Sequence, residues 1–166
     1  LWNAVKTGLK QIADCVGKYP AITAVVGLPV RIGTKLYNCA AVLNRGEVSG
    51  LVPKTYLAAD EKRWFAAGSG LTNCWLNPED IGLISSEDYY AVPVCADQMF
   101  LLGDDAAVGI EICADMMAPQ PRCAELAANM TYLELSTYPG YMDSFVAACF
   151  LPHTDASLFP HSVQEG

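Results

Sequence analysis

The sequence contains few basic residues, and this limits the partners that it can have. Its 166 residues include 10 Lys and Arg against 18 Asp and Glu, for a net charge of −8. No basic cluster is present that could hold a phosphate backbone. No apolar run approaches the roughly 20 residues of a membrane-spanning helix. We therefore expect neither nucleic acid nor membrane as a partner.

Histidine and paired cysteine motifs are also scarce. The only histidines are His153 and His161, near the end of the sequence, so a Cys–His dyad has no support from spacing. The seven cysteines are odd in number, and no two of them lie at CxxC spacing. Neither a disulfide framework nor a metal site is predicted. A reducing, cytoplasmic location is the simplest expectation.

The composition is that of a globular domain, with 52% apolar and 17% charged residues. The sequence does not begin with Met, and it opens inside a helical pattern. We therefore expect it to be part of a longer protein. Residues 1–20 are typical of an amphipathic helix rather than of a signal peptide.

Hydrophobic periodicity predicts the first elements. Residues 1–18 place apolar side chains at helical spacing, and Gly17 and Pro20 end the helix. Residues 22–28 form a continuous β-branched run, which predicts a strand buried on both faces. Residues 35–43 and 47–52 flank Asn44-Arg45-Gly46, which predicts a hairpin with a glycine-containing turn.

The later elements are shorter. We expect a short helix or turn at 61–65, a long loop at 66–88, and a helix at 122–129. Further strands are predicted at 89–94, 99–102, 108–112 and 131–136. Strands that alternate with helices favour a layered α/β domain. We assign this domain to residues 1–137, and we expect residues 138–166 to form an irregular tail.

Cys113 ends the predicted strand at 108–112, where the chain turns. Many enzymes place a nucleophile at such a point. The alternative is a buried, unreactive small side chain. Glu111 lies two residues earlier, so strand alternation places it on the same face as Cys113.

Lys54 directly follows Pro53, which marks the end of a strand because proline cannot donate to the ladder. A cysteine that attacks an amide needs a base, and a cation or hydrogen-bond donors for the oxyanion. Lys54 could favour the thiolate and stabilise the oxyanion, with a carboxylate as base. The alternative is a solvated surface lysine.

Five runs of residues follow one another in a recognisable order. They are Val26-Gly27-Leu28-Pro29, Lys35–Val42, Val52–Leu57, Glu61–Phe65 and Gly109–Cys113. Together they resemble the nitrilase (carbon–nitrogen hydrolase) superfamily, and more narrowly residues 1–136 resemble the glutamine amidohydrolase domain of bacterial glutamine-dependent NAD⁺ synthetases. The resemblance implies an α-β-β-α four-layer sandwich, here incomplete at its N-terminus.

The resemblance also implies roles for particular residues. Lys54 and Cys113 match two members of a Glu–Lys–Cys triad, and the base Glu is expected upstream of residue 1. Glu61 aligns with a second, supporting Glu of the family. Glu111 belongs to the motif around the cysteine and is a minor candidate for a substitute base. Ser136 matches the end of a substrate-contacting run.

Two residues depart from the family pattern. Ala114 stands where the family has Glu, and Glu134 stands where it has Asn.

The implied function is hydrolysis of glutamine by a cysteine nucleophile, supplying ammonia for NAD⁺ synthesis. No cofactor is expected for this domain, and ATP and Mg would belong to a synthetase domain that this sequence lacks. Expected partners are glutamine, that synthetase domain and a second copy of the chain. One alternative is an inactive folded remnant without the base Glu. The other is a stand-alone amidase of the superfamily with another substrate.

Overall fold

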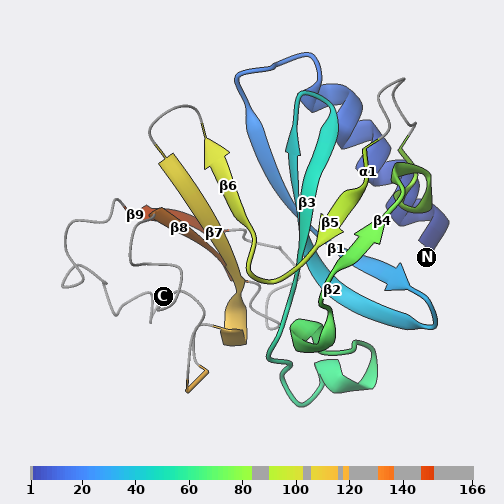
Figure 1. Ribbon diagram of the computed structural model, residues 1–166, viewed down its shortest axis with the longest axis vertical. Helices are drawn as coiled ribbons and strands as arrows, with labels where there is room; N and C mark the ends of the chain where they lie inside the picture. The colour runs from blue at the N-terminus through green and yellow to red at the C-terminus, as the bar shows by residue number, and fades with distance from the viewer. Residues whose placement is uncertain are drawn as a thin grey trace, which may run out of the picture.

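The structure is a computed structural model, and it describes residues 2–83, 90–102, 106–115, 118–119, 131–136 and 147–151. Within these residues one α-helix, α1 (Trp2–Val16), accompanies nine strands in two sheets (Figure 1). The first sheet has the order β1-β2-β3-β5-β4, and the second has the order β6-β7-β8-β9. The bounds of the strands are β1 (Thr23–Ile32), β2 (Lys35–Asn44), β3 (Glu47–Pro53), β4 (Cys74–Leu76), β5 (Val92–Val94), β6 (Met99–Leu102), β7 (Ala106–Ile112), β8 (Thr131–Ser136) and β9 (Ala147–Leu151).

Helix α1 covers one face of the first sheet, and its position confirms the predicted amphipathic helix. Leu9, Ala13 and Val16 are buried in one cluster with side chains of β2, which alternate along that strand. The helix ends at Val16, and the Gly17 amide donates a hydrogen bond of 2.8 Å to the Ala13 carbonyl oxygen. Among the described residues, no helix is long and apolar enough to cross a lipid bilayer.

The second sheet packs on the other face of the first. Ala40, Val42 and Val52 of the first sheet are buried in one cluster with the β7 side chains that point toward them. Strand β2 therefore buries both of its faces, one under α1 and one under the second sheet. A helix, a sheet and a second sheet lie in successive layers, which confirms the mixed α/β prediction. The helix predicted at 122–129 lies outside the described residues.

The β2–β3 hairpin is confirmed. Asn44 pairs with Glu47, and the two residues between them, Arg45 and Gly46, have φ values of 53° and 87°. Positive φ at both central positions is the geometry of the tight hairpin turn that matches strand twist. The register between β2 and β3 shifts at Val42/Leu43.

The strand predicted at 22–28 is present, but its predicted burial is wrong. Strand β1 is the outer strand of the first sheet and runs on to Ile32, and several of its side chains are only half-buried. An outer strand has one free edge, which also explains how Pro29 is accommodated. A continuous β-branched run does not by itself distinguish an outer strand from a central one.

Two strands occur where the sequence pattern predicts none. Strand β4 and the short 3-10 helices η2 (Gly68–Gly70) and η3 (Pro78–Ile81) lie in the predicted loop 66–88. Strand β9 lies in the predicted irregular tail and pairs with β8. Both strands are short and take their register from a neighbouring strand, so local periodicity carries little signal for them. Of the strand predicted at 89–94, residues 92–94 form β5, and residue 89 lies outside the described residues.

Candidate active site

Lys54 begins the chain segment that leaves the first sheet after β3. Its amide donates a hydrogen bond of 2.8 Å to the Asn38 carbonyl oxygen, and its own carbonyl oxygen accepts one of 2.8 Å from the Gly68 amide. The residue is only 2% exposed. Lys54 is therefore a buried lysine and not the solvated surface lysine of the alternative interpretation.

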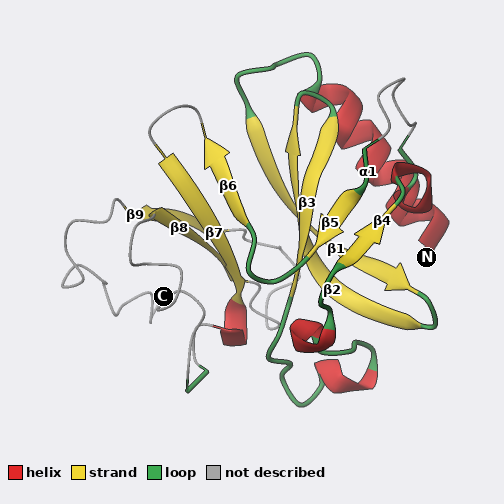
Figure 2. Ribbon diagram, viewed as in Figure 1, coloured by secondary structure: helices red, strands yellow, loops and turns green. Residues whose placement is uncertain are grey.

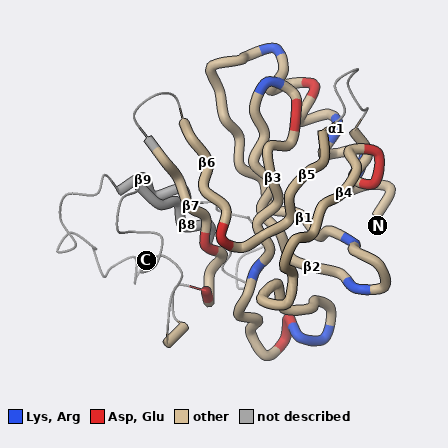
Figure 3. The backbone as a smooth tube through the Cα atoms, in the orientation of Figure 1, with Lys and Arg blue, Asp and Glu red and all other residues tan. Residues whose placement is uncertain are grey.

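Glu61 neutralises this buried ammonium group. Lys54 Nζ donates to both carboxylate oxygens of Glu61, at 2.8 Å and 2.7 Å. Glu61 opens the short 3-10 helix η1 (Glu61–Arg63), and its Oε2 also accepts a hydrogen bond of 2.8 Å from the Ala58 amide. In Figure 3 the loop that carries η1 shows basic and acidic positions side by side. Since an ammonium group has three donors, one N–H of Lys54 remains beyond the two that Glu61 accepts.

Cys113 follows β7 directly and is the first residue of the 3-10 turn η4 (Cys113–Asp115). Its φ is 53°, in the left-handed region that L residues rarely adopt. Such a conformation costs on the order of 1–3 kcal/mol and is often found at functional sites. The side chain is half-buried and packs against the cluster between the two sheets.

This turn overturns one sequence-based expectation. Val108, Ile110 and Ile112 of β7 point into the cluster between the sheets, so Glu111 lies on the opposite face of the strand. Cys113 does not share that face, because strand alternation stops at Ile112, the φ of Cys113 is positive, and Cys113 packs against the cluster between the sheets. Glu111 is 2% exposed within β7.

Asp115 joins the two segments that carry Lys54 and Cys113. Its Oδ1 accepts hydrogen bonds from the Thr55 amide at 3.0 Å, the Thr55 hydroxyl at 2.8 Å and the Tyr56 amide at 2.6 Å. Burial raises the pKa of this carboxyl above its usual value, and the hydrogen bonds from Tyr56, Thr55 and Ile112 oppose that rise. The sequence pattern indicates only a polar residue at the strand end, and the contact across the fold is visible only in the structure.

Together these contacts place both predicted residues at one end of the fold. Lys54 is adjacent to Thr55, Cys113 is two residues before Asp115, and the hydrogen bonds between Thr55 and Asp115 join them. Figure 2 shows η4 and the loop that carries η1 at the same end of the two sheets. Strand β8 runs parallel to β7 with Leu135 opposite Ile112, so the backbone of Ser136 reaches this end as well.

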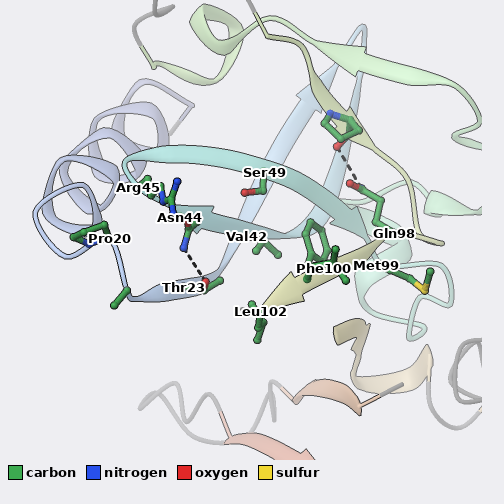
Figure 4. A pocket seen from close by; sticks show the side chains of 13 residues that line it. Pro20, Thr23, Val42, Asn44, Arg45, Ser49, Gln98, Met99, Phe100 and Leu102 are labelled. Carbon is green, nitrogen blue, oxygen red and sulfur yellow. Dashed lines mark hydrogen bonds between the residues drawn. The ribbon is translucent and has the colours of Figure 1, made fainter. Parts of the chain in front are cut away.

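The structure also has a groove that is separate from the candidate site. It has a volume of about 1050 Å³ and lies between β2, β3 and β6, where Asn44, Arg45, Phe100 and neighbouring residues line it (Figure 4). None of the predicted site residues is among those that line it. The part of the chain that the structure describes holds no group of three or more His, Cys, Asp or Glu that could bind a metal ion. His153 and His161 lie outside that part.

Comparison with solved structures identifies the class of fold. The chain is similar to the glutamine-dependent NAD⁺ synthetase of Cytophaga hutchinsonii, with a TM-score of 0.52 and 22% identity over 80% of this chain and 26% of that one. It is also similar to the Acinetobacter baumannii synthetase in complex with ADP, with a TM-score of 0.53 and 21% identity over 82% of this chain and 22% of that one. The mixed α/β fold is therefore one that glutamine-dependent NAD⁺ synthetases contain.

Sequence relatives give the more specific result. The glutamine-dependent NAD⁺ synthetase of Mycobacterium leprae is 34% identical over 109 residues, which is 62% of this chain and 15% of that protein. The Mycobacterium tuberculosis enzyme is 36% identical over 109 residues, and the Arabidopsis thaliana enzyme is 29% identical over 119. The homologues of this chain are glutamine-dependent NAD⁺ synthetases, as the resemblance predicts, and the chain spans about 15% of the length of these curated relatives.

One comparison points elsewhere. A family model described as the C-terminal domain of RACo, the ASKHA domain, matches residues 82–163. This match covers slightly less than half of the chain, and much of it falls on residues outside the described ranges. The family that it names differs from the synthetases found by the other two comparisons.

Proposed function

We propose that this chain carries an amide-hydrolysing site in which Cys113 is the nucleophile and Lys54 is its cationic partner. The observation that carries the proposal is the network of hydrogen bonds from Thr55 and Tyr56 to Asp115. It joins the segment of a buried, ion-paired lysine to the strained turn of the cysteine. Buried lysines are rare, and a cation beside a thiol is what activates it.

The chemistry follows from these groups. The Cys113 thiolate adds to the amide carbon, and the tetrahedral oxyanion is stabilised by donors such as the remaining N–H of Lys54. The C–N bond then breaks, ammonia leaves after gaining a proton, and water hydrolyses the thioester to the carboxylic acid. In this proposal Glu61 supplies the counter-charge of Lys54. The proposal leaves the general base to the carboxylate that the family resemblance implies.

The finer parts of the proposal concern the fold and the partners. We propose the nitrilase-type four-layer sandwich, with the observed helix and two sheets as three of its layers, and glutamine as the substrate because the homologues are named for it. The ammonia would serve NAD⁺ synthesis in a synthetase domain, where ATP and Mg act, and the site itself would need no cofactor. Self-association is also proposed, since Met99 and Leu101 of β6 are exposed apolar side chains.

Ammonia release from glutamine, measured on the chain together with the upstream segment that the family resemblance implies, and compared with release from asparagine and simple amides, tests the activity. We expect Cys113→Ser and Lys54→Ala to abolish release, because one removes the nucleophile and the other its cation. Cys15→Ser is the matched control, since Cys15 is an exposed cysteine of α1, and it should keep the full rate. An unchanged rate in Lys54→Ala would remove Lys54 from the mechanism.

Iodoacetamide labelling tests the activation of the thiol without a substrate. We expect Cys113 to react faster near neutral pH than the exposed Cys15. Cys39 should be protected, because it is fully buried and burial raises its pKa. Equal labelling of Cys113 and Cys15 would contradict the proposal.

A folded unit without catalysis is the second candidate function, and Ala114 favours it, because the family resemblance implies Glu at that position. A chain that unfolds cooperatively but releases no ammonia from any amide would support this candidate. Faster release from another amide than from glutamine would support a stand-alone amidase.

A further inference from the structure

Asp115 differs from an ordinary turn-capping residue in where its hydrogen bonds come from. A capping carboxylate usually accepts from amides of its own turn. Oδ1 of Asp115 accepts three hydrogen bonds from Thr55 and Tyr56, which are 60 and 59 residues away in sequence. Its Oδ2 accepts longer ones from Thr55 at 3.3 Å and from Ile112 at 3.4 Å. Asp115 is 4% exposed, so these groups replace water around its carboxylate.

These donors belong to both sheets. Thr55 and Tyr56 follow the end of β3 in the first sheet, and Ile112 is the last residue of β7 in the second. Lys54 is anchored to the first sheet by its own backbone, through Asn38. Cys113 is anchored to the second sheet, because it continues β7. A bridge at this point fixes the position of one segment relative to the other.

We infer that Asp115 is a positioning residue that holds the Lys54 segment against the Cys113 turn, so that thiol activation depends on a carboxylate outside the reacting groups. The inference rests on the proposed function, since it assigns Asp115 a role in the same site. The Thr55 hydroxyl is the second half of this bridge, because it donates one of the three hydrogen bonds to Oδ1. Asp115 acts through Lys54 and does not itself exchange a proton with the substrate.

The test is the rate of iodoacetamide alkylation of Cys113 in the full chain, followed by peptide mass spectrometry from pH 5 to 10. We expect Asp115→Ala to slow alkylation at pH 7 by about tenfold and to move the pH profile of Cys113 toward that of Cys15. Asp115→Asn should restore most of the rate, because its amide oxygen can still accept hydrogen bonds from Thr55 and Tyr56. Thr55→Val, which removes one of them, should give a smaller shift in the same direction.

A double-variant comparison separates positioning from general stabilisation. If Asp115 acts through Lys54, then Asp115→Ala should have no further effect on Cys113 alkylation when Lys54 is already Met. A structural role alone would lower the unfolding midpoint in both backgrounds without this dependence. Gly50→Ala is the matched control, because it disturbs packing beside Gln98 and Phe100, away from this site. It should lower the unfolding midpoint and leave the pH profile of Cys113 unchanged.

The outcomes are distinct. If Cys113 is fast and Lys54-dependent in the parent chain but Asp115→Ala keeps its pH profile, the inference is overturned and the proposed function stands. If Cys113 reacts like Cys15 in the parent chain and Lys54→Met changes nothing, both are rejected. If Asp115→Ala fails to fold, the pH profiles of Cys113 alkylation in Asp115→Asn and Thr55→Val test the inference in its place. A Thr55→Val profile identical to that of the parent chain then counts against the bridge.

Discussion

Removing the carboxylate of Glu61 should destabilise the fold more than removing the amine of Lys54. The Lys54 side chain is 1% exposed and that of Glu61 is 18% exposed. Glu61→Ala leaves an ammonium group buried without its counter-charge, and breaking a buried pair in this way costs about 3–5 kcal/mol. We expect a value near the lower limit, about 3 kcal/mol, because water already reaches part of Glu61.

Lys54→Met removes the charge but keeps a long apolar side chain in the space. Glu61 then retains partial contact with water and the hydrogen bond from the Ala58 amide. We expect this variant to lose about 1 kcal/mol. The double variant should be about as stable as Lys54→Met alone, which corresponds to a coupling energy of roughly 3 kcal/mol between the two residues.

The measurement is urea unfolding of each variant, followed by tryptophan fluorescence and extrapolated linearly to zero denaturant. In thermal unfolding, a loss of 3 kcal/mol should lower the midpoint by about 6–12 °C for a chain of this size. Asp14→Ala is the control, because the Lys10–Asp14 pair of α1 has a similar distance of 2.6 Å but exposed side chains. It should cost about 0.3 kcal/mol. A Glu61→Ala variant no less stable than Lys54→Met, or strictly additive losses, would refute the reasoning.

Three further predictions concern the glycines and Asp115. Gly50→Ala should cost about 2 kcal/mol in urea unfolding, because its Cβ would overlap the Gln98 side-chain amide. That amide cannot move freely, since its Nε2 donates hydrogen bonds to three backbone carbonyl oxygens. Gly27→Ala, with nothing within 4 Å of its Cβ, should be neutral, and a similar loss there would remove packing as the cause. Gly8→Ala in α1 should gain about 1 kcal/mol in the same assay, since its Cβ also meets nothing within 4 Å; no gain would contradict this. Burial raises the pKa of Asp115 above 3.8, so the folded chain binds the proton more readily than the unfolded chain. The free energy of unfolding of the parent chain, relative to that of Asp115→Asn, should therefore fall as pH rises from 3.8 through the raised pKa of Asp115 in the folded chain. A rise over that range would contradict the direction of the shift.

The elements that could be predicted from sequence are those with their own periodicity or turn chemistry. Helix α1 has a long apolar stripe, and the β2–β3 hairpin has a turn at Arg45-Gly46 that only a few residue types fit. Strand β4 has three residues and β9 has five, too few for alternation to stand out, and both are defined by pairing with a neighbour. The burial of β1 was mispredicted for a related reason, because the position of a strand within a sheet is a property of the whole fold.

In the candidate site, too, residues with a local sequence signal could be predicted, and a residue defined by distant contacts could not. Lys54 and Cys113 could be proposed as candidates from their positions at two strand ends, and Glu61 from the family resemblance. Asp115 could not, because its partners are about 60 residues away and a lone aspartate after a strand has many possible uses. The face of Cys113 was also mispredicted, because period-2 alternation assumes an extended backbone and the φ of 53° at Cys113 breaks it.

The arrangement of charges at this end of the fold also bears on the chemistry. The Lys54–Glu61 pair is neutral as a whole, so its effect on a nearby anion depends on which member lies closer and is less screened by water. Lys54 is the more deeply buried member, and Glu61 is partly exposed. In the proposed site the thiolate would therefore meet the ammonium group at low effective dielectric, while water would weaken the opposing field of the carboxylate. In this proposal a small movement of the Lys54 segment would remove this advantage, and a bridge such as Asp115 would therefore influence the thiol without taking part in the reaction.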